Sequence, residues 1–503
     1  MNDHERRKAQ AMAMGGADKL AARRKAGLLN ARERIALLFD GGAFHEAGLF
    51  ATAERPQDRD RTPADGKIVG FGHVEGRQVA AVSNDLTVMG ASSSAVNGRK
   101  IAYAKTVAAR NGLPLVFLGE SSGGRLPDNM GARGMGASAW DPQQYMRSRE
   151  TPWASAVLGP AFGSSAWYTC LSDFAVMRRG AILAVASPRV TSQAIGQDID
   201  PEELGGSEMH ARRSGLIDQV VDTDEEAIAA IRRFLNYLPS HAGEAPPRIA
   251  ARAPSLDPAS IGAIVPENRA RVYDMGKVLQ ALVDADSFFP LKERFARNLL
   301  TGLARIDGRT IGIIANNPMH KGGAVDYDAC SKAINLLVLC DSFNVPVVQL
   351  VDQPGFLVGL EGELRGMPAK IMSNIQALQM ATVPKLSVVL RKSYGAAFIN
   401  MGGGSNSDEF ILWDRAEVNF MDPGIAVAIV HGVDARSDPE TFRDLHASMA
   451  HDSSPYEIAG MFSAQAVIRP GETRAHLARA LELHARGPAR GLGQRRLASW
   501  PYA

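Results

Sequence analysis

The sequence predicts an α/β protein built from two copies of one unit, and three observations support this prediction. Matching segments recur at one constant offset along the chain: Gly76 with Gly308, Pro114 with Pro346, and Gly163 with Gly395. Short apolar runs alternate with longer helical patterns in both halves. Residues 238–258 are rich in proline and alanine, as is typical of a linker. A repeat in one register indicates two units, each with its own sheet.

The first predicted element is a helix that leads into the first unit. Asn30 is a candidate N-cap, because Glu33 follows three residues later. The apolar residues Ile35, Leu37 and Leu38 then supply a buried face. We therefore expect a capped helix to begin directly after Asn30.

Strands and helices then alternate. In the first half we expect strands at residues 79–85 and 113–119, separated by a helix at residues 98–112. In the second half the corresponding helix is predicted at residues 328–344. The order strand, helix, strand is therefore the predicted building block of each unit.

The boundary between the two domains is predicted near Pro246, inside the proline-rich stretch. Residues 1–246 would form an N-terminal domain and residues 247–503 a C-terminal domain. The composition agrees with more than one globular domain, because the 503 residues are 45% hydrophobic and 22% charged.

Charge and hydropathy exclude several classes of protein. The 56 basic and 54 acidic side chains give a formal net charge of +2, so we expect no nucleic acid partner and no binding to an anionic membrane. No apolar run approaches the roughly 20 residues of a membrane span, and the N-terminus lacks the apolar core of a signal peptide. The sequence therefore predicts a cytoplasmic protein.

The three cysteines do not form a recognisable site. Cys170, Cys330 and Cys340 stand singly, without the spacing of a zinc site or a disulfide framework. We expect all three to pack as small apolar residues and the chain to bind no metal.

The repeated turns are the best candidates for chemistry. Gly163 and Gly395 each follow an apolar run and precede a predicted helix, together with Ser164 in the first half and Ala396 and Ala397 in the second. Main-chain N–H groups at such a helix start lack acceptors and would stabilise an oxyanion. The alternative is a tight turn in which small residues only avoid clashes.

Other catalytic motifs are missing. The sequence has no GxSxG, HExxH or GxxxxGK[ST] pattern, which argues against serine hydrolase, zinc protease and P-loop chemistry. A catalytic serine in "ESSGGR" remains an alternative, but it would need a histidine base that spacing does not reveal.

Six segments resemble one known family. They are "ARERIALLFDGGAFHE", "SNDLTVMGASSS", "DIDPEELGG", "ANNPMHKGGAVDYDACSKA", "VDQPGFLVG" and "VPKLSVVLRKSYGAAF", between about Ala22 and about Leu483. They look like the carboxyltransferase (beta) subunits of biotin-dependent acyl-CoA carboxylases, of the propionyl-CoA carboxylase type. The resemblance implies two tandem crotonase-like domains and a hexamer built as a trimer of dimers. Each active site would lie between the N-terminal domain of one protomer and the C-terminal domain of its neighbour.

The resemblance also implies a reaction. A carboxyl group would move from carboxybiotin, carried by a separate protein, to an acyl-CoA through an enolate. By match to the family's motif, the amides of Gly163 and Ser164 would hold the thioester oxygen, on the acyl-CoA side. The amides of Ala396 and Ala397 would hold the biotin oxygen, on the biotin side.

CoA is expected near "SSGGR". Ser122, Gly123 and Gly124 would allow close approach of the backbone, and Arg125 would face a phosphate. The alternative for Arg125 is a surface charge. Ile399 stands where propionyl- and acetyl-CoA members carry an acid in the acyl pocket, so we expect altered acyl selectivity, with a silent packing change as the alternative.

Two further departures concern the substrate. Ser164 replaces a glycine that is common in the family, and it either narrows the approach or adds a hydroxyl donor. Residues 126–153 diverge most from the family pattern, which leaves the acyl group open. Trp140 and Trp153 would line the pocket there, unless they only pack. His320 and Lys321 are weaker candidates for acid/base work.

Missing modules define the expected partners. The chain has no biotin-attachment Met-Lys-Met and no Gly-rich ATP-binding loop, so a biotin carboxylase and biotin carboxyl carrier subunit must supply carboxybiotin. Two alternatives remain. The chain would be a subunit of an acyl-CoA decarboxylase that runs the transfer in reverse, or a noncatalytic assembly subunit.

Overall fold

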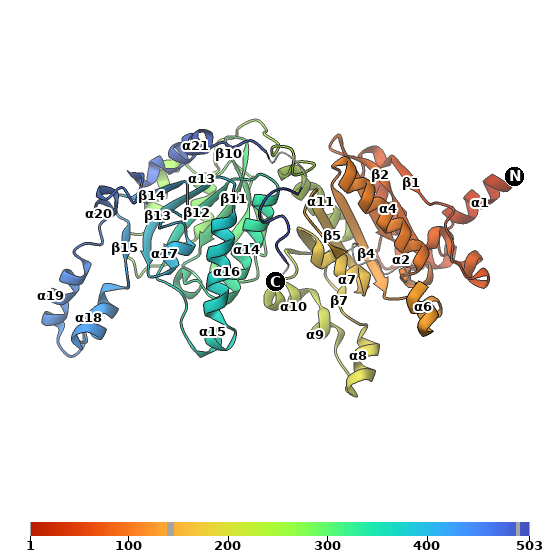
Figure 1. The fold of residues 1–503 in the computed structure, drawn as a ribbon, viewed down its shortest axis with the longest axis horizontal. Helices are drawn as coiled ribbons and strands as arrows, with labels where there is room; N and C mark the ends of the chain where they lie inside the picture. The colour runs from red at the N-terminus through yellow and green to blue at the C-terminus, as the bar shows by residue number, and fades with distance from the viewer. Residues whose placement is uncertain (1, 138–144, 489–492, 502–503) are drawn as a thin grey trace. The chain divides into compact units, whose positions relative to one another are not determined.

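The structure is a computed structural model that describes residues 2–137, 145–488 and 493–501. It divides into two compact units, which consist mainly of Met1–Glu244 and Ala245–Pro488. In Figure 1 the first unit runs from red to yellow and the second from green to blue. Each unit is an α/β fold around its own sheet, as the repeat predicts.

The first unit contains an eight-stranded mixed sheet with the order β1-β2-β3-β4-β5-β6-β8, and β7 pairs with β5. The first three strands are antiparallel and the others are parallel. Its strands are β1 (Phe44–Ala47), β2 (Lys67–Val74), β3 (Arg77–Asn84), β4 (Leu115–Ser122), β5 (Trp153–Phe162), β6 (Phe174–Arg178), β7 (Ile182–Ala184) and β8 (Gln219–Val221).

Helices cover both faces of this sheet (Figure 1). The helices of this unit are α1 (Asp3–Met12), α2 (Ala17–Lys25), α3 (Ala31–Leu38), α4 (Ala95–Asn111), α5 (Leu126–Asn129), α6 (Gly131–Ala137), α7 (Ser164–Leu171), α8 (Pro188–Ile195), α9 (Pro201–Gly205), α10 (Ser207–Met209) and α11 (Asp224–Tyr237), of which α3, α4, α7 and α11 pack on the sheet. The predicted cap is confirmed, because Asn30 and Glu33 form a capping box at the start of α3. A core cluster joins α4, α7 and the sheet through Ile101, Phe117 and Tyr168.

The second unit repeats this plan. Its sheet has the order β16-β14-β13-β12-β11-β10-β9, and β15 pairs with β13. The strands are β9 (Phe289–Leu291), β10 (Leu299–Ile306), β11 (Arg309–Asn316), β12 (Val347–Gln353), β13 (Lys385–Tyr394), β14 (Glu409–Trp413), β15 (Glu417–Asn419) and β16 (Ala466–Ile468). The helices are α12 (Ile261–Ile264), α13 (Met275–Leu282), α14 (Tyr327–Ser342), α15 (Leu360–Leu364), α16 (Met367–Met380), α17 (Ala397–Asn400), α18 (Pro423–His431), α19 (Pro439–Ala450), α20 (Pro455–Gly460) and α21 (Thr473–Leu483).

The constant offset of the sequence repeat holds in atomic detail. Strands β3, β4 and β5 begin at this same offset before β11, β12 and β13. The buried lysines Lys100 and Lys332 share the offset and have the same role. The ammonium of Lys100 donates to the carbonyls of Ala64 and Lys67, and that of Lys332 donates to the carbonyls of Phe295 and Leu299. The internal repeat is therefore confirmed.

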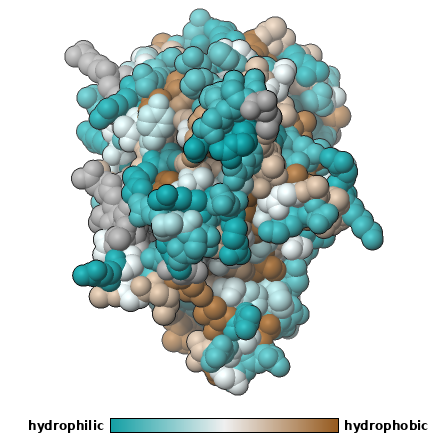
Figure 2. Space-filling model, turned by 90° about the vertical axis from the view of Figure 1, so that its right-hand side faces the viewer, coloured by the Kyte–Doolittle hydropathy of each residue, from teal (hydrophilic) through white to brown (hydrophobic). Residues whose placement is uncertain are grey.

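Surface properties match a globular chain. Within residues 2–137, 145–488 and 493–501, no helix combines the length and the apolar character needed to cross a bilayer. Figure 2 shows one face, on which hydrophilic residues predominate and hydrophobic side chains form smaller patches. Cys330 and Cys340 are buried, and burial raises the pKa of the Cys330 thiol to about 12.

Candidate active site

In the first unit, two turns meet at the carboxyl edge of the parallel strands. Ser93, in the loop after β3, forms a parallel bridge with Gly124, in the loop after β4. The amide of Ser93 donates to the carbonyl of Gly123 at 2.8 Å, and the amide of Arg125 donates to the carbonyl of Ser93 at 2.8 Å. The predicted CoA segment is thereby fixed to the loop that precedes α4.

The turn after β5 lies against this segment. Gly163 has φ 61° and ψ −128°, a conformation that side chains disfavour, and α7 begins at the next residue. A Cβ atom added to Gly163 would lie 3.6 Å from the Cα of Gly123, so the two turns are in contact. Among the residues that the structure describes, the main-chain amides of Gly163 and Ser164 donate no hydrogen bond to the backbone of another helix, strand or loop.

A pair of serine hydroxyls joins the turn after β5 to the loop after β3. The Oγ of Ser164 lies 2.7 Å from the Oγ of Ser93, and both residues are partly exposed. Three of the predicted site residues, Gly123, Gly163 and Ser164, are therefore brought together. Ser93 was not among them, although it lies in a segment that carries the family resemblance.

The second unit contains the equivalent arrangement. Val325 forms a parallel bridge with Phe356, and its amide donates to the carbonyl of Gly355 at 3.1 Å. Gly395 has φ 63°, and its amide donates to the carbonyl of Asn419 at 3.0 Å. The next two residues carry amides at the start of α17, where the first turn of a helix leaves its N–H groups without intrahelical acceptors.

The accessibility of this second turn differs between its residues. Ala396 is exposed, whereas Ala397 is completely buried. Ile399, one residue before the end of α17, is 38% exposed, so its side chain is available to a ligand on the surface of this unit. Asn406 holds the C-terminal end of this turn, because its side-chain amide donates to the carbonyl of Ile399 at 2.9 Å.

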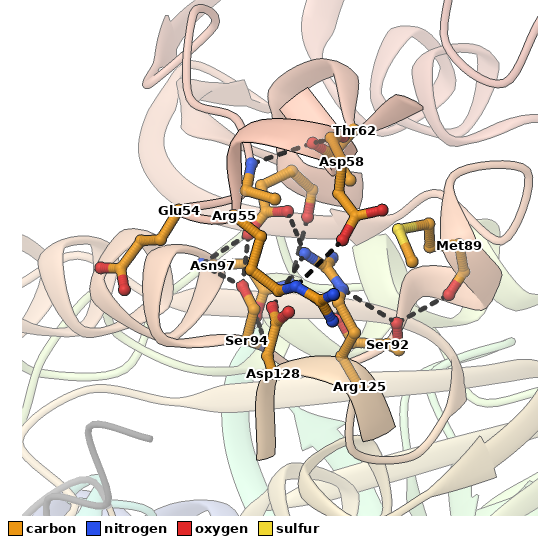
Figure 3. A network of polar contacts seen from close by, with 12 residues as sticks. Glu54, Arg55, Asp58, Thr62, Met89, Ser92, Ser94, Asn97, Arg125 and Asp128 are labelled. Carbon is orange, nitrogen blue, oxygen red and sulfur yellow. Dashed lines mark hydrogen bonds and ion pairs between the residues drawn. The ribbon is translucent and has the colours of Figure 1, made fainter. Parts of the chain in front are cut away.

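Arg125 lies in a buried polar network (Figure 3). Its side chain is 1% exposed, and its guanidinium forms an ion pair with Asp65 at 2.6 Å and contacts Ser92. Asp65 in turn accepts from the hydroxyl of Ser94, the N-cap of α4. The surface-charge alternative for Arg125 is therefore wrong. The phosphate contact stays a prediction, and a phosphate would have to reach a guanidinium that is 1% exposed and already paired with Asp65.

A pocket lies behind the first turn. Its lining includes Ser164 and Tyr168 from α7, Phe117 from β4 and Lys67 from β2. Phe117 and Tyr168 stack with ring centroids 4.8 Å apart. Lys67 is 1% exposed and donates to the carbonyl of Ala91 at 2.7 Å, and burial lowers the pKa of its ammonium to about 7. The pocket therefore combines apolar side chains and aromatic rings with hydroxyl groups, the amide of Asn84 and one buried amine.

The other aromatic and basic candidates have structural surroundings. Trp153 is buried, contacts Phe117 edge to face at 5.6 Å and stacks under the guanidinium of Arg147, so it packs rather than lining an open pocket. Trp140 lies outside the described residues. Lys321 forms an ion pair with Asp326 at 2.5 Å, at the N-terminus of α14.

The chain matches one known protein family over nearly its whole length. The model of the carboxyl transferase domain matches residues 22–496, which is nearly the whole chain. The chain belongs to the carboxyl transferase domain family. The propionyl-CoA carboxylase beta chain of Roseobacter denitrificans is 34% identical to this carboxyltransferase, with 95% of this chain and 94% of the relative covered. The methylmalonyl-CoA decarboxylase subunit alpha of Veillonella parvula is 31% identical, with 94% of each chain covered.

A solved structure agrees with the same conclusion. The crystal structure of transcarboxylase 12S, described as a hexamer with methylmalonyl-CoA and methylmalonic acid bound, superposes on this carboxyltransferase with a TM-score of 0.89. The two sequences are 30% identical, and 98% of each chain is covered. The expected fold of two crotonase-like domains is confirmed, and so is the class of enzyme, the carboxyltransferase component of acyl-CoA carboxylases.

Three residues of this site, Asp65, Ser93 and Lys67, were not predicted from the sequence. Asp65 and Arg125 are 60 residues apart, and Ser93 and Ser164 are 71 residues apart, so neither pairing has a local signal. Lys67 does have one, because a lysine opens the otherwise apolar run "KIVGFG" of β2. A cation at the start of a buried strand indicates a specific environment.

Proposed function

We propose that this chain transfers the carboxyl group of carboxybiotin to the α-carbon, or a vinylogous carbon, of an acyl-CoA. The observation that carries the proposal is the pair of equivalent turns at Gly163 and Gly395, one in each unit. Both turns place a positive-φ glycine between a buried strand and a helix, followed by residues with small side chains. Two such turns suit a reaction in which two different oxygens carry negative charge.

On the acyl-CoA side, the amides of Gly163 and Ser164 would hold the thioester oxygen. When the α-proton leaves, the electron pair of the C–H bond moves toward this oxygen, and the two N–H groups stabilise the enolate. The enolate carbon then forms the new bond to carbon dioxide. Gly123, which contacts the Gly163 turn, has no side chain that would block the approach of the thioester. Ser122 and Gly124 lie on either side of it in the chain.

On the biotin side, the amides of Ala396 and Ala397 would hold the ureido oxygen. Carboxybiotin supplies carbon dioxide and, once it has released it, the base that removes the α-proton. The fit of this group rests on Ala396, which is exposed at a helix start and has a small side chain, whereas Ala397 is completely buried. The chain itself therefore positions the reactants and stabilises charge, and none of its side chains needs to act as the base.

The proposed partners are a biotin carboxylase, a biotin carboxyl carrier subunit and further copies of this chain in a hexamer, with a cytoplasmic location. An apolar surface repeated in both units supports self-association. Three exposed apolar residues of the first unit each have an exposed apolar counterpart in the second unit: Val185 with Phe420, Val190 with Ile425, and Ile195 with Val430. The spacing along the sequence is the same in all three pairs and is slightly longer than that between β3 and β11. They lie on or just before α8 and α18, and exposed apolar side chains in matching places indicate contact surfaces.

The experiment is reconstitution with the biotin-bearing partner that co-purifies with this chain. Bicarbonate and ATP are supplied with short, branched and aromatic acyl-CoAs, and incorporation of labelled bicarbonate is measured. We expect incorporation with at least one acyl-CoA that requires both this chain and biotin. Incorporation that persists without this chain would support the assembly-subunit alternative and contradict the proposal.

A second candidate is the reverse reaction, as a subunit of an acyl-CoA decarboxylase. The similarity to a methylmalonyl-CoA decarboxylase subunit favours it, because the same two turns would serve both directions. The reverse reaction breaks the bond that the forward reaction forms, and it passes through the same enolate. Co-purification of a membrane-embedded subunit in place of a biotin carboxylase would favour this direction.

A further inference from the structure

The hydroxyls of Ser93 and Ser164 contain two protons, and their 2.7 Å contact uses one of them. Among the residues that the structure describes, neither hydroxyl has another hydrogen-bond partner. One proton therefore remains available, beside the amide that is proposed to hold the thioester oxygen. We infer that the Ser164 hydroxyl, oriented by Ser93, is a third hydrogen-bond donor to the developing enolate oxygen; this inference rests on the proposed function.

Ser93 is suited to orient its partner. Its amide and its carbonyl are both fixed by the loop after β4, through bonds of 2.8 Å to the carbonyl of Gly123 and from the amide of Arg125. The neighbouring Arg125 is held in turn by the buried ion pair with Asp65. The backbone of Ser93 is therefore anchored on both sides. Either hydroxyl can donate in the pair, and when Ser93 donates to Ser164 the proton of Ser164 is left for a ligand.

The second unit provides an internal comparison. At the positions that the repeat makes equivalent, Ser93 is replaced by Val325 and Ser164 by Ala396. The bridge and the turn still form there, with Val325 paired to Phe356 and Gly395 at φ 63°. The hydroxyl pair is therefore not needed to build this turn. Its presence on the acyl-CoA side alone points to the ligand of that side.

The physical effect is expected to depend on charge. A hydrogen bond to an anionic oxygen is stronger than one to a neutral carbonyl. The hydroxyl should therefore contribute little to binding of the thioester and more to the enolate. Stronger bonding in the transition state than in the ground state raises kcat, with little change in KM.

The test uses the purified chain and two CoA ligands. One is a nitroalkyl-CoA thioether, whose nitronate form imitates the enolate, and the other is the matching ketone analogue of an acyl-CoA. For Ser164→Ala we expect about 10-fold weaker binding of the nitronate, because the variant loses one hydrogen bond to a charged group. Binding of the ketone should weaken by less than about 2-fold. Ser93→Ala should show a smaller loss of the same kind, and Ser164→Thr should restore nitronate binding.

A matched control exists in the same unit. Ser155 and Ser172 form another hydroxyl pair, at 2.6 Å, and Ser172 also donates to the carbonyl of Tyr168. Ser155 lies within β5 and Ser172 follows α7, so neither belongs to the turn. Ser155→Ala should leave the affinity for both ligands unchanged.

Two results would overturn the inference. One is nitronate affinity in Ser164→Ala equal to that of the unmodified chain; the other is an equal loss for nitronate and ketone, which would mean a general distortion. Failure of the proposed function is a separate outcome, because the unmodified chain would then bind neither CoA ligand. Binding of both ligands together with an unchanged Ser164→Ala variant would remove the hydroxyl donor alone.

Discussion

The guanidinium of Arg125 lies 2.6 Å from the carboxylate of Asp65, and both side chains are at most 1% exposed. This buried ion pair connects the loop after β4 with the segment that precedes β2. Asp65 also accepts from the hydroxyl of Ser94 and from the amide of Asn97 at 3.1 Å, in the first turn of α4. The pair therefore helps to position the loop after β4, which carries Gly123, against the loop after β3, which carries Ser93.

Removal of one partner should be costly. We expect Arg125→Met to lower the free energy of unfolding by about 3–5 kcal/mol, because it leaves the Asp65 carboxylate buried without its ion pair. Denaturant unfolding measures the change. Arg61→Met is the matched control, since Arg61 is 71% exposed in its ion pair with Asp58 and should change stability by less than about 1 kcal/mol. Equal effects of the two variants would contradict the structural role of Arg125.

Lys67 predicts a pH dependence of stability. Burial lowers the pKa of its ammonium to about 7 from its usual value of 10.5. Between these values the unfolded chain binds a proton that the folded chain does not, so stability rises with pH across this window. Relative to Lys67→Met, the unmodified chain should gain up to about 1.4 kcal/mol per pH unit there.

The comparison of unfolding free energies at several pH values between about 7 and 10 gives the slope for the unmodified chain and for Lys67→Met. A slope for Lys67→Met that matches that of the unmodified chain would mean that Lys67 stays charged in the folded state.

Ile399 predicts a change in acyl selectivity. We expect Ile399→Asp to shift preference toward short acyl groups, because a charge replaces a branched apolar side chain that is 38% exposed beside the second turn. Such a change shifts relative kcat/KM by about 10- to 200-fold. Turnover of several acyl-CoAs by both proteins measures it, and an identical ranking of substrates would exclude Ile399 as a determinant.

The two glycines predict separable defects. Gly163→Ala and Gly395→Ala place a side chain at φ 61° and φ 63°, which costs about 1–3 kcal/mol and displaces the following amides. We expect at least about 10-fold lower turnover in each case. Gly163→Ala should act mainly on the CoA substrate, and Gly395→Ala mainly on biotin.

The effects of the two variants on each substrate can be measured with the chain alone. The assay supplies free biotin and a carboxyacyl-CoA and measures the biotin-dependent loss of the carboxyl group. The control is Gly180→Ala, which has φ 79° in an exposed turn with open space around the added Cβ atom. It should lower stability without a specific effect on either substrate. If all three variants behaved alike, the turns would have no special part in the reaction.

The repeat explains why so much of the fold was predictable. Strands β2, β3, β4 and β5 of the first unit each have a counterpart in the second unit at one fixed spacing, so two weak local patterns support each other, as for β4 and β12. The helix start after Asn30 was predictable because its capping signal lies within a single helical turn. The turns at Gly163 and Gly395 were predictable because the repeat places the same glycine after an apolar run in both halves.

The rest of the site depends on contacts between distant segments. The ring stack of Phe117 on Tyr168 arises because α7 packs on β4, and the bond of Lys67 to Ala91 joins the start of β2 to the loop after β3. No local pattern specifies which side chains then meet. Arg125 illustrates the limit, since its residue type alone allowed a phosphate contact or a surface charge and did not indicate a buried partner.

The central claim is that main-chain amides of the first unit bind the thioester oxygen of the acyl-CoA and that those of the second unit bind the ureido oxygen of biotin. A crystal structure with biotin and a ketone analogue of an acyl-CoA tests it most directly. We predict the ketone oxygen within about 3.2 Å of the amides of Gly163 and Ser164, and the ureido oxygen equally close to those of Ala396 and Ala397. Ligand oxygens bound by side chains elsewhere, with these four amides paired to protein carbonyls, would contradict it.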